Sequence, residues 1–324
     1  QPRLPLWGHE PDNDPKVVER WIDVATDHGI NVFVYDWYWY DGGPFLESAL
    51  NDGFLGAVNN EKMQFYIMWA NHDVKYNYLN YHLHKDNTDI LWDAKVDREN
   101  FRIIVDRVIN QYFKRPNYFK INGEPVFSIF SIGKLVESFD NSLEEARKGL
   151  EYFRDEVRKA GFPGLHIQWN QGGGSIMSEK AAGNFVNSVR TMGFNSVAMY
   201  NMGGLDEDYL VYGANSLKIR EQMDSILDVP VFPCVSVGWD DTPRFPDKGI
   251  HDVVHYHNTP QSFAALLAKA KKYADSHPEQ PRLITINAWN EWVEGSYLLP
   301  DMLHGFGYLE AVREVILEGK YDKY

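Results

Sequence analysis

The chain has 324 residues, a formal net charge of −14 and 15% aromatic residues, among them ten Trp and nineteen Tyr. This length suits one large α/β domain or two ordinary ones, and the acidity argues against a nucleic-acid partner. No segment has the unbroken apolar length of a membrane helix, so we expect no membrane span. Cys234 is the single cysteine, which excludes an intrachain disulfide framework; within its apolar run it is expected to be a buried, inert thiol.

Short apolar runs alternate with amphipathic stretches along the chain. They predict strands at residues 31–35, 65–69, 125–131, 165–169, 196–200, 231–237 and 283–289, with a weaker strand at 4–7 before them. Sequence signals for helix ends lie between these runs. Asp14-Pro15 is a typical N-cap followed by proline, and Ser142 with Glu145 forms a capping box.

Strand and helix alternate seven or eight times, which predicts a parallel sheet. The strands are too uniformly apolar for a sheet with one face in water, so helices should cover it. Length and strand number favour an α/β fold of the (β/α)8 TIM barrel type, with a first strand that is weak or missing. No GxGxxG fingerprint opens an early helix, which argues against a nucleotide-binding sheet. No linker or repeat interrupts residues 1–324, so we expect a single catalytic domain.

Chemistry in a (β/α)8 barrel occupies the loops after the carboxyl ends of the strands. Six predicted strands end in aromatic residues beside groups that hydrogen-bond hydroxyls. The candidate substrate-binding residues are Asp36, Trp37, Trp39, Trp69, Asn71, His72, Trp169, Asn170, Tyr200, Trp239, Asp240, Arg244, Asn290 and Trp292. Their convergence on one rim predicts a groove for a polysaccharide or oligosaccharide.

Residues 284–301, ITINAWNEWVEGSYLLPD, place Glu291 and Glu294 among aromatic rings. Carboxylates supply protons and stabilise an oxocarbenium-like centre, while aromatic faces hold the apolar side of a pyranose. A glutamate at a strand end is more often solvated or ion-paired, so the aromatic setting and the position on the barrel carry the argument. Glu291 and Glu294 are the candidate catalytic residues.

Metal chemistry has little support in the sequence. His251, His255 and His257 fall in an apparent loop without an acidic or cysteine partner pattern. We therefore expect no metal and no cofactor.

Five segments resemble the glycoside hydrolase family 99-like group, often labelled WbsX-type. They read HGINVFVYDWYWYDGGPFLE (28–47), MWANHD (68–73), INGEPVFSIF (121–130), GWDDTPR (238–244) and INAWNEWVEGSYLLPD (286–301). Together they span nearly the whole chain in order. The similarity to the characterised family 99 endo-α-mannosidases is more distant and rests mainly on the NEWxEG motif.

This resemblance implies a retaining glycosidase without an enzyme nucleophile. Glu291 would take the proton of the sugar's own 2-hydroxyl, which attacks the anomeric carbon to give a 1,2-anhydro sugar. Glu294 would protonate the leaving oxygen and later activate water. We then expect Glu291 to be ionised near neutrality and the pKa of Glu294 to be raised. The mannosidases have His where this chain has Val293, so their mannose-specific contacts are not carried over.

Other functions remain open on the sequence. A double-displacement glycosidase would use Glu291 as nucleophile and Asp36 or Asp240 as acid. A glycosyltransferase of polysaccharide biosynthesis and a non-catalytic glycan-binding module are further alternatives. Arg244 and His72 would suit a sulfate or uronate, but neutral hydroxyls would serve as well. An extracytoplasmic location, periplasmic or secreted, is expected from the substrate class.

Overall fold

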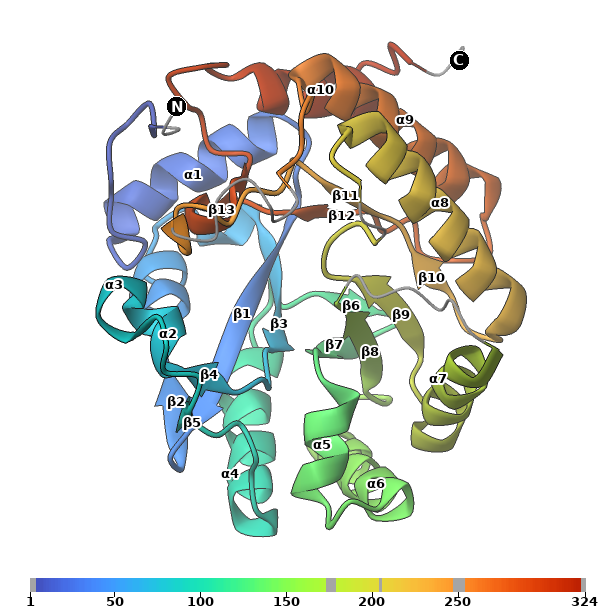
Figure 1. Cartoon of the computed structure of the whole chain (residues 1–324). Coiled ribbons are helices and arrows are strands. Elements are labelled where there is room, and N and C mark those ends of the chain that lie inside the picture. The colour runs from blue at the N-terminus through green and yellow to red at the C-terminus, as the bar shows by residue number, and fades with distance from the viewer. Residues whose placement is uncertain (1–3, 173–178, 204–205, 247–253, 322–324) are drawn as a thin grey trace.

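A computed structural model describes residues 4–172, 179–203, 206–246 and 254–321, and of residues 179–182 the backbone alone. A parallel sheet forms its centre (Figure 1). Its strands, in spatial and chain order, are β1 (Val32–Tyr40), β3 (Gln64–Trp69), β7 (Glu124–Ile129), β8 (His166–Gln171), β9 (Ser196–Met199) and β10 (Val231–Phe232). Beyond Pro233, β11 (Cys234–Ser236) pairs in parallel with β12 (Thr285–Asn287).

Helices surround these strands, as Figure 1 shows. They are α1 (Pro15–Asp27), α4 (Arg98–Val108), α5 (Ile132–Ser138), α6 (Leu143–Lys159), α7 (Glu179–Met192), α8 (Tyr209–Ile226), α9 (Pro260–Ser276) and α10 (Gly307–Ile316). The predicted N-caps are confirmed, since Asp14 accepts from the N–H of Lys16 and Ser142 from that of Glu145. The return bond of the capping box is not made, because the N–H of Ser142 donates to the carbonyl of Phe139 instead. The architecture is the predicted (β/α)8 barrel.

Shorter helices and strands connect or extend these elements. They are β2 (Gly43–Phe45), η1 (Ala49–Phe54), η2 (Asn60–Lys62), β4 (Val74–Lys75), α2 (Tyr76–Leu79), α3 (Tyr81–His84), β5 (Ile90–Trp92), η3 (Ile109–Phe113), β6 (Lys120–Ile121), β13 (Asn290–Glu291), η5 (Trp292–Glu294) and β14 (Ser296–Tyr297). Strand β2 turns back on β1 in antiparallel register, which makes β1 longer than the run at 31–35 predicts.

The expected strand at residues 4–7 does not form. Pro5 makes an isolated antiparallel bridge with Asp301, and the rest of the run is loop. Within the described residues, no pairing joins β12 to β1, so the ring of strands is open there. On the inner face of β1, Val34 is 38% exposed.

The opposite, outward faces of the strands pack against the helices. Phe33, Phe65, Trp69, Phe127 and Ile167 are nearly or fully buried in the main core cluster. This two-residue alternation of inward and outward side chains decides which residues reach the mouth of the barrel. No helix in the described ranges is long and apolar enough to cross a membrane.

Candidate active site

Glu291 and Glu294 lie on a tight hairpin after the carboxyl end of β12. Strands β13 and β14 pair in antiparallel register, and η5 with Gly295 makes the turn between them. Gly295 has φ +60°, and a Cβ there would lie 2.8 Å from the Cβ of Asp240, so glycine is required. The N–H of Asp240 donates to the carbonyl of Glu294 at 2.7 Å, which fastens the hairpin to the loop after β11.

Arg244 connects the two carboxylates. Its Nη1 donates to Oε1 of Glu294 at 3.0 Å, and its Nη2 lies 3.4 Å from Oε1 of Glu291. The Glu294 side chain is 12% exposed and that of Glu291 28% exposed, so Glu294 is the more desolvated of the two. The second oxygen of Glu294, Oε2, is buried and has no hydrogen-bond partner among the described residues.

Burial gives both carboxyls pKa values above that of an ordinary glutamate. Burial, reinforced by the charge of Glu291, raises the pKa of Glu294 to about 7, although Arg244 opposes the rise. Burial also raises the pKa of Glu291, again against Arg244. A carboxyl that titrates near neutrality can give and take a proton at physiological pH, as an acid/base catalyst must.

Asp36 is a third carboxyl of the same site. It lies on the inner face of β1, accessible to water on one side and enclosed by protein on the others. This partial enclosure, together with the charge of Glu291, raises the pKa of Asp36 to about 7. Because the side chain is accessible to water, solvent screening reduces the effect of this shift on stability.

Two tyrosines complete the cluster. The carboxylates of Asp36, Glu291 and Glu294 all act on the hydroxyls of Tyr38 and Tyr200, and burial is the main cause of the raised pKa of both phenols. Both phenols therefore stay protonated and can donate to sugar oxygens. Tyr200 also packs edge-on against Phe130, with 5.6 Å between ring centroids.

Three of the tryptophans predicted to bind substrate belong to the hydrophobic core instead. Trp37, Trp39 and Trp69 are only 0–3% exposed. Nε1 of Trp37 donates to Glu47 at 2.7 Å, and Nε1 of Trp39 to Asn100 at 3.3 Å. The expectation that these indoles stack on sugars does not fit their placement, because they occupy outward positions of their strands.

Trp169 and Asn170 follow the same alternation on β8. Trp169 faces outward, where it packs on Phe185 and its Nε1 donates to the carbonyl of Phe130 at 3.1 Å. Asn170 is buried on the inner face, with Nδ2 2.9 Å from the sulfur of Met68. Asn170 thus lies in the barrel interior, and Trp169 does not face the mouth.

Asn71 and His72 follow β3 along the chain. Both ends of the Asn71 amide are engaged by the backbone of Ser131, at 2.8 and 2.7 Å, so this buried side chain fixes the loop. The His72 ring lies edge-on to Tyr38 and to Phe130, at 5.9 and 5.8 Å between centroids. His72 therefore borders the cluster, whereas Asn71 is a structural residue.

The remaining candidates divide between the loop after β11 and the hairpin. Asp240 caps its own loop, since its Oδ1 accepts from the N–H and hydroxyl of Thr242. Trp239 is half-buried at the start of that loop. Asn290 and Trp292 face a hollow of about 310 Å³ whose lining includes Trp7, His9, Glu10 and Asp12. Trp292 also stacks on Tyr297 at 3.7 Å between centroids.

Potential metal ligands do not gather in the part of the chain that the structure describes. His255 stacks on Tyr212 and His257 contacts Asp208, while His251 lies outside the described residues. Cys234 is buried, and burial raises the pKa of its thiol to about 12, so it is no nucleophile.

Tyr38 and Asp241 were not among the predicted site residues. Tyr38 shares the inner face of β1 with Asp36, and the two-residue period of a strand would have identified it. Asp241 acts on the Glu294 carboxyl from the loop after β11. Only the fold of that loop brings it there, so no signal in the sequence separates it from Asp240.

Known proteins resemble this chain in sequence and in fold. An uncharacterized protein WxcX from Xanthomonas campestris pv. campestris strain B100 is 24% identical over 334 residues, which cover 98% of this chain and 44% of that protein. The WxcX protein of strain ATCC 33913 gives the same figures. The chain thus spans less than half the length of these relatives.

Among solved structures, the GH99 endo-α-mannosidase of Bacteroides thetaiotaomicron in complex with bis-tris-propane has a TM-score of 0.61 at 15% identity, over 99% of this chain and 89% of that chain. A glycoside hydrolase-like protein reaches 0.64 at 14% identity, over 97% and 89%. At such identities the likeness shows a common fold. The chain also matches the family described as Glycosyltransferase WbsX over residues 1–312 and therefore belongs to that WbsX family, with a fold like that of the GH99 structures.

Proposed function

We propose that the protein is a retaining glycoside hydrolase that cleaves a polysaccharide or complex glycan. One observation carries the proposal: Glu291 and Glu294 share a single arginine, and the more buried of them has a pKa of about 7. Paired carboxyls with different environments are the usual requirement for glycosidic acid/base catalysis.

The reaction would proceed through the substrate's own 2-hydroxyl. Glu291 takes the 2-hydroxyl proton while O2 bonds to the anomeric carbon, and Glu294 gives its proton to the departing glycosidic oxygen. In the second half, Glu294 takes a proton from water, the water oxygen bonds to the anomeric carbon as the bond from that carbon to O2 breaks, and O2 recovers its proton from Glu291. Two inversions give net retention, and no protein atom becomes bonded to the sugar.

The tyrosines and Asp36 would orient that sugar. Tyr38 and Tyr200 offer phenolic donors beside the acids. α-Mannosides are the first substrates to test, because the similar solved structures include an endo-α-mannosidase. Because a polymeric substrate would lie outside the cytoplasm, we propose an extracytoplasmic location for the protein. Cell fractionation followed by immunoblotting tests this location.

Glu294→Gln tests the proposal. Removing the general acid should lower kcat by roughly 10²–10⁴ while glycan binding stays nearly unchanged. Glu318→Gln, which alters an exposed ion pair with Arg313, is the matched control and should leave both quantities unchanged. Unaltered turnover of Glu294→Gln would refute the role assigned to that residue.

Double displacement is the second candidate mechanism, and the raised pKa of Asp36 favours it. Asp36 would then be the acid and Glu291 the nucleophile. A 2-deoxy-2-fluoro glycoside distinguishes the mechanisms, because it would form a covalent adduct on Glu291 by double displacement and none by 2-hydroxyl participation. Mass spectrometry of the intact protein reads the outcome.

Glycosyl transfer is the alternative that the WbsX description supports. It requires a nucleotide- or lipid-linked sugar donor, and the sequence has no dinucleotide fingerprint. Calorimetric titration with a panel of nucleotide-sugars tests it. Binding accompanied by sugar transfer to a glycan acceptor would replace the hydrolase proposal.

A further inference from the structure

Residues 74–92 form an excursion between β3 and α4 that the catalytic proposal does not use. It contains β4, α2, α3 and β5, and it exposes several large side chains. Tyr78 is 48% exposed, Leu79 55% and Leu83 74%. Because it follows the carboxyl end of β3, the excursion rises on the same side of the barrel as the acids.

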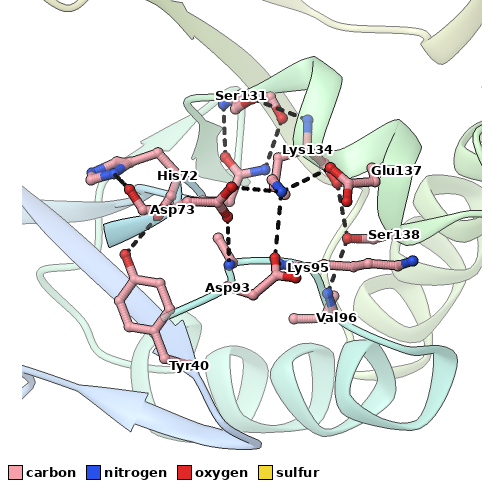
Figure 2. Close-up of polar contacts among 12 residues, drawn as sticks. Tyr40, His72, Asp73, Asp93, Lys95, Val96, Ser131, Lys134, Glu137 and Ser138 are labelled. Atoms are coloured by element: carbon pink, nitrogen blue, oxygen red, sulfur yellow. Dashed lines mark hydrogen bonds and ion pairs between the residues drawn. The ribbon is translucent and has the colours of Figure 1, made fainter. Parts of the chain in front are cut away.

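Both ends of the excursion are held by one lysine (Figure 2). The Lys134 ammonium on α5 lies 2.9 Å from Asp73, just before β4, and 3.4 Å from Asp93, just after β5. It also contacts Glu137 at 2.8 Å, and Oδ1 of Asp73 accepts from the N–H of Ala94 at 3.0 Å. Lys134 is 13% exposed, so this clamp is partly shielded from water.

The far part of the excursion reaches the loop that carries Arg244. Tyr78 and Tyr81 both lie edge-on to Phe245, each with 5.3 Å between ring centroids. The Arg244 guanidinium carbon is 5.9 Å from the centre of the Tyr78 ring. Since the same guanidinium contacts Glu291 and Glu294, a short continuous path joins the Tyr78 ring to the acids.

We propose that Tyr78 is an outer sugar platform of the glycan groove, stacking on a pyranose beyond the residues joined by the cleaved bond, and that Lys134 positions it. This inference rests on the proposed glycosidase function and specifies its substrate as an extended chain. Aromatic rings bind the apolar face of sugars, and a half-exposed ring beside the acids offers such a face. Arg244 on one side of the ring keeps it oriented.

Tyr78→Ala, Tyr78→Phe and the control Leu83→Ala are compared on α-mannohexaose and on a para-nitrophenyl α-mannoside. The ratio of kcat/KM for the hexaose to that for the aryl glycoside should fall about 3- to 10-fold in Tyr78→Ala. It should stay near the wild-type value in Tyr78→Phe, which keeps the ring, and in Leu83→Ala, which removes an exposed side chain of the same excursion. Equal ratios in all four proteins would overturn the platform.

Lys134→Met tests the positioning role. Without the Lys134 ion pairs the ends of the excursion are no longer held, so KM for the hexaose should rise while kcat stays within about twofold. A variant that fails to fold would instead show a lower kcat for both substrates and a lower melting temperature. Retention of the wild-type KM by folded Lys134→Met protein would contradict the positioning role.

Failure of the platform and failure of the hydrolase proposal are separable. If neither compound is cleaved, calorimetry on the wild type and on Tyr78→Ala still compares the affinity for α-mannohexaose with that for mannose. A wild type that binds the hexaose no more tightly than mannose overturns the platform, whatever its catalytic activity.

Discussion

At the scale of single residues, Arg244 limits how far burial raises the pKa values of the two acids. It holds both carboxylates, and its positive charge opposes the rise that burial imposes on the pKa of Glu291 and of Glu294. In the proposed mechanism the ionised form of Glu291 and the protonated form of Glu294 are active. The acid limb of the pH profile therefore follows Glu291, and the alkaline limb follows Glu294.

Arg244→Gln should move both limbs of the kcat/KM profile to higher pH. Loss of the cation removes the influence that lowers each pKa, so Glu291 needs a higher pH to ionise and Glu294 keeps its proton to a higher pH. Arg244→Lys keeps the charge and should shift the limbs less. Arg147→Gln, in an exposed pair with Glu144, is the distant control. Movement of only one limb would show that Arg244 acts on a single carboxyl.

At the scale of one element, strand β1 shows what the sequence could and could not predict. The run around residues 31–35 identifies the strand, and Asp36 follows as a polar residue at its end. The hairpin with β2 then lengthens the strand to Tyr40, which places 37 and 39 on the outward face. The aromatic character of Trp37 and Trp39 alone favours sugar binding, but the alternation of inward and outward side chains along the strand places both in the core. Alternation was available in the sequence, whereas the length of the strand was not.

Adjacent residues of β1 should consequently have opposite mutant phenotypes. Trp37→Phe should lower the free energy of unfolding by about 1–3 kcal/mol, because it opens space in the core and removes the donor to the largely shielded carboxylate of Glu47. Tyr38→Phe should change stability by less than about 1 kcal/mol and lower kcat/KM roughly 2- to 10-fold, the effect of one lost hydrogen bond. Urea unfolding and steady-state kinetics measure the two effects. If Trp37→Phe instead affected kcat/KM and Tyr38→Phe affected stability, the side chain of residue 37 would face inward and that of residue 38 outward.

At the scale of the whole molecule, the sequence predicts the barrel because each strand and helix is locally well marked. The carboxyl ends of parallel strands then meet on one side, which is how residues as distant as Asp36, Arg244 and Glu291 were expected together. Contacts that depend on loop paths were not predictable. The approach of Tyr78 to Arg244 and the clamp at Lys134 join segments with no shared pattern in the sequence. The opening between β1 and β12 likewise comes from the assembled ring.

The Asp36 carboxyl lowers the stability of the whole fold by an amount that varies with pH. The pKa of Asp36 is about 7 in the folded protein and ordinary in the unfolded chain. Below the ordinary value both states hold the proton, and the residue has no effect. As pH rises toward 7, the unfolded chain ionises first, so the fold loses stability through this window and the loss levels off above it. Active-site groups commonly destabilise the fold that carries them.

Asp36→Asn should therefore raise the melting temperature above pH 7 and leave it nearly unchanged below pH 4. We expect an increase of about a degree or two, since roughly 1 kcal/mol corresponds to about 2 °C in a chain of this size. Asp23→Asn is the control of opposite sign, because a hydrogen bond from Lys62 lowers the pKa of Asp23, so its carboxylate stabilises the fold at neutral pH. Calorimetric melts between pH 3 and 9 compare the variants. Destabilisation by Asp36→Asn at every pH would show that the ionised carboxylate is paired within the fold, and the assignment of Asp36 to an open catalytic mouth would then fail.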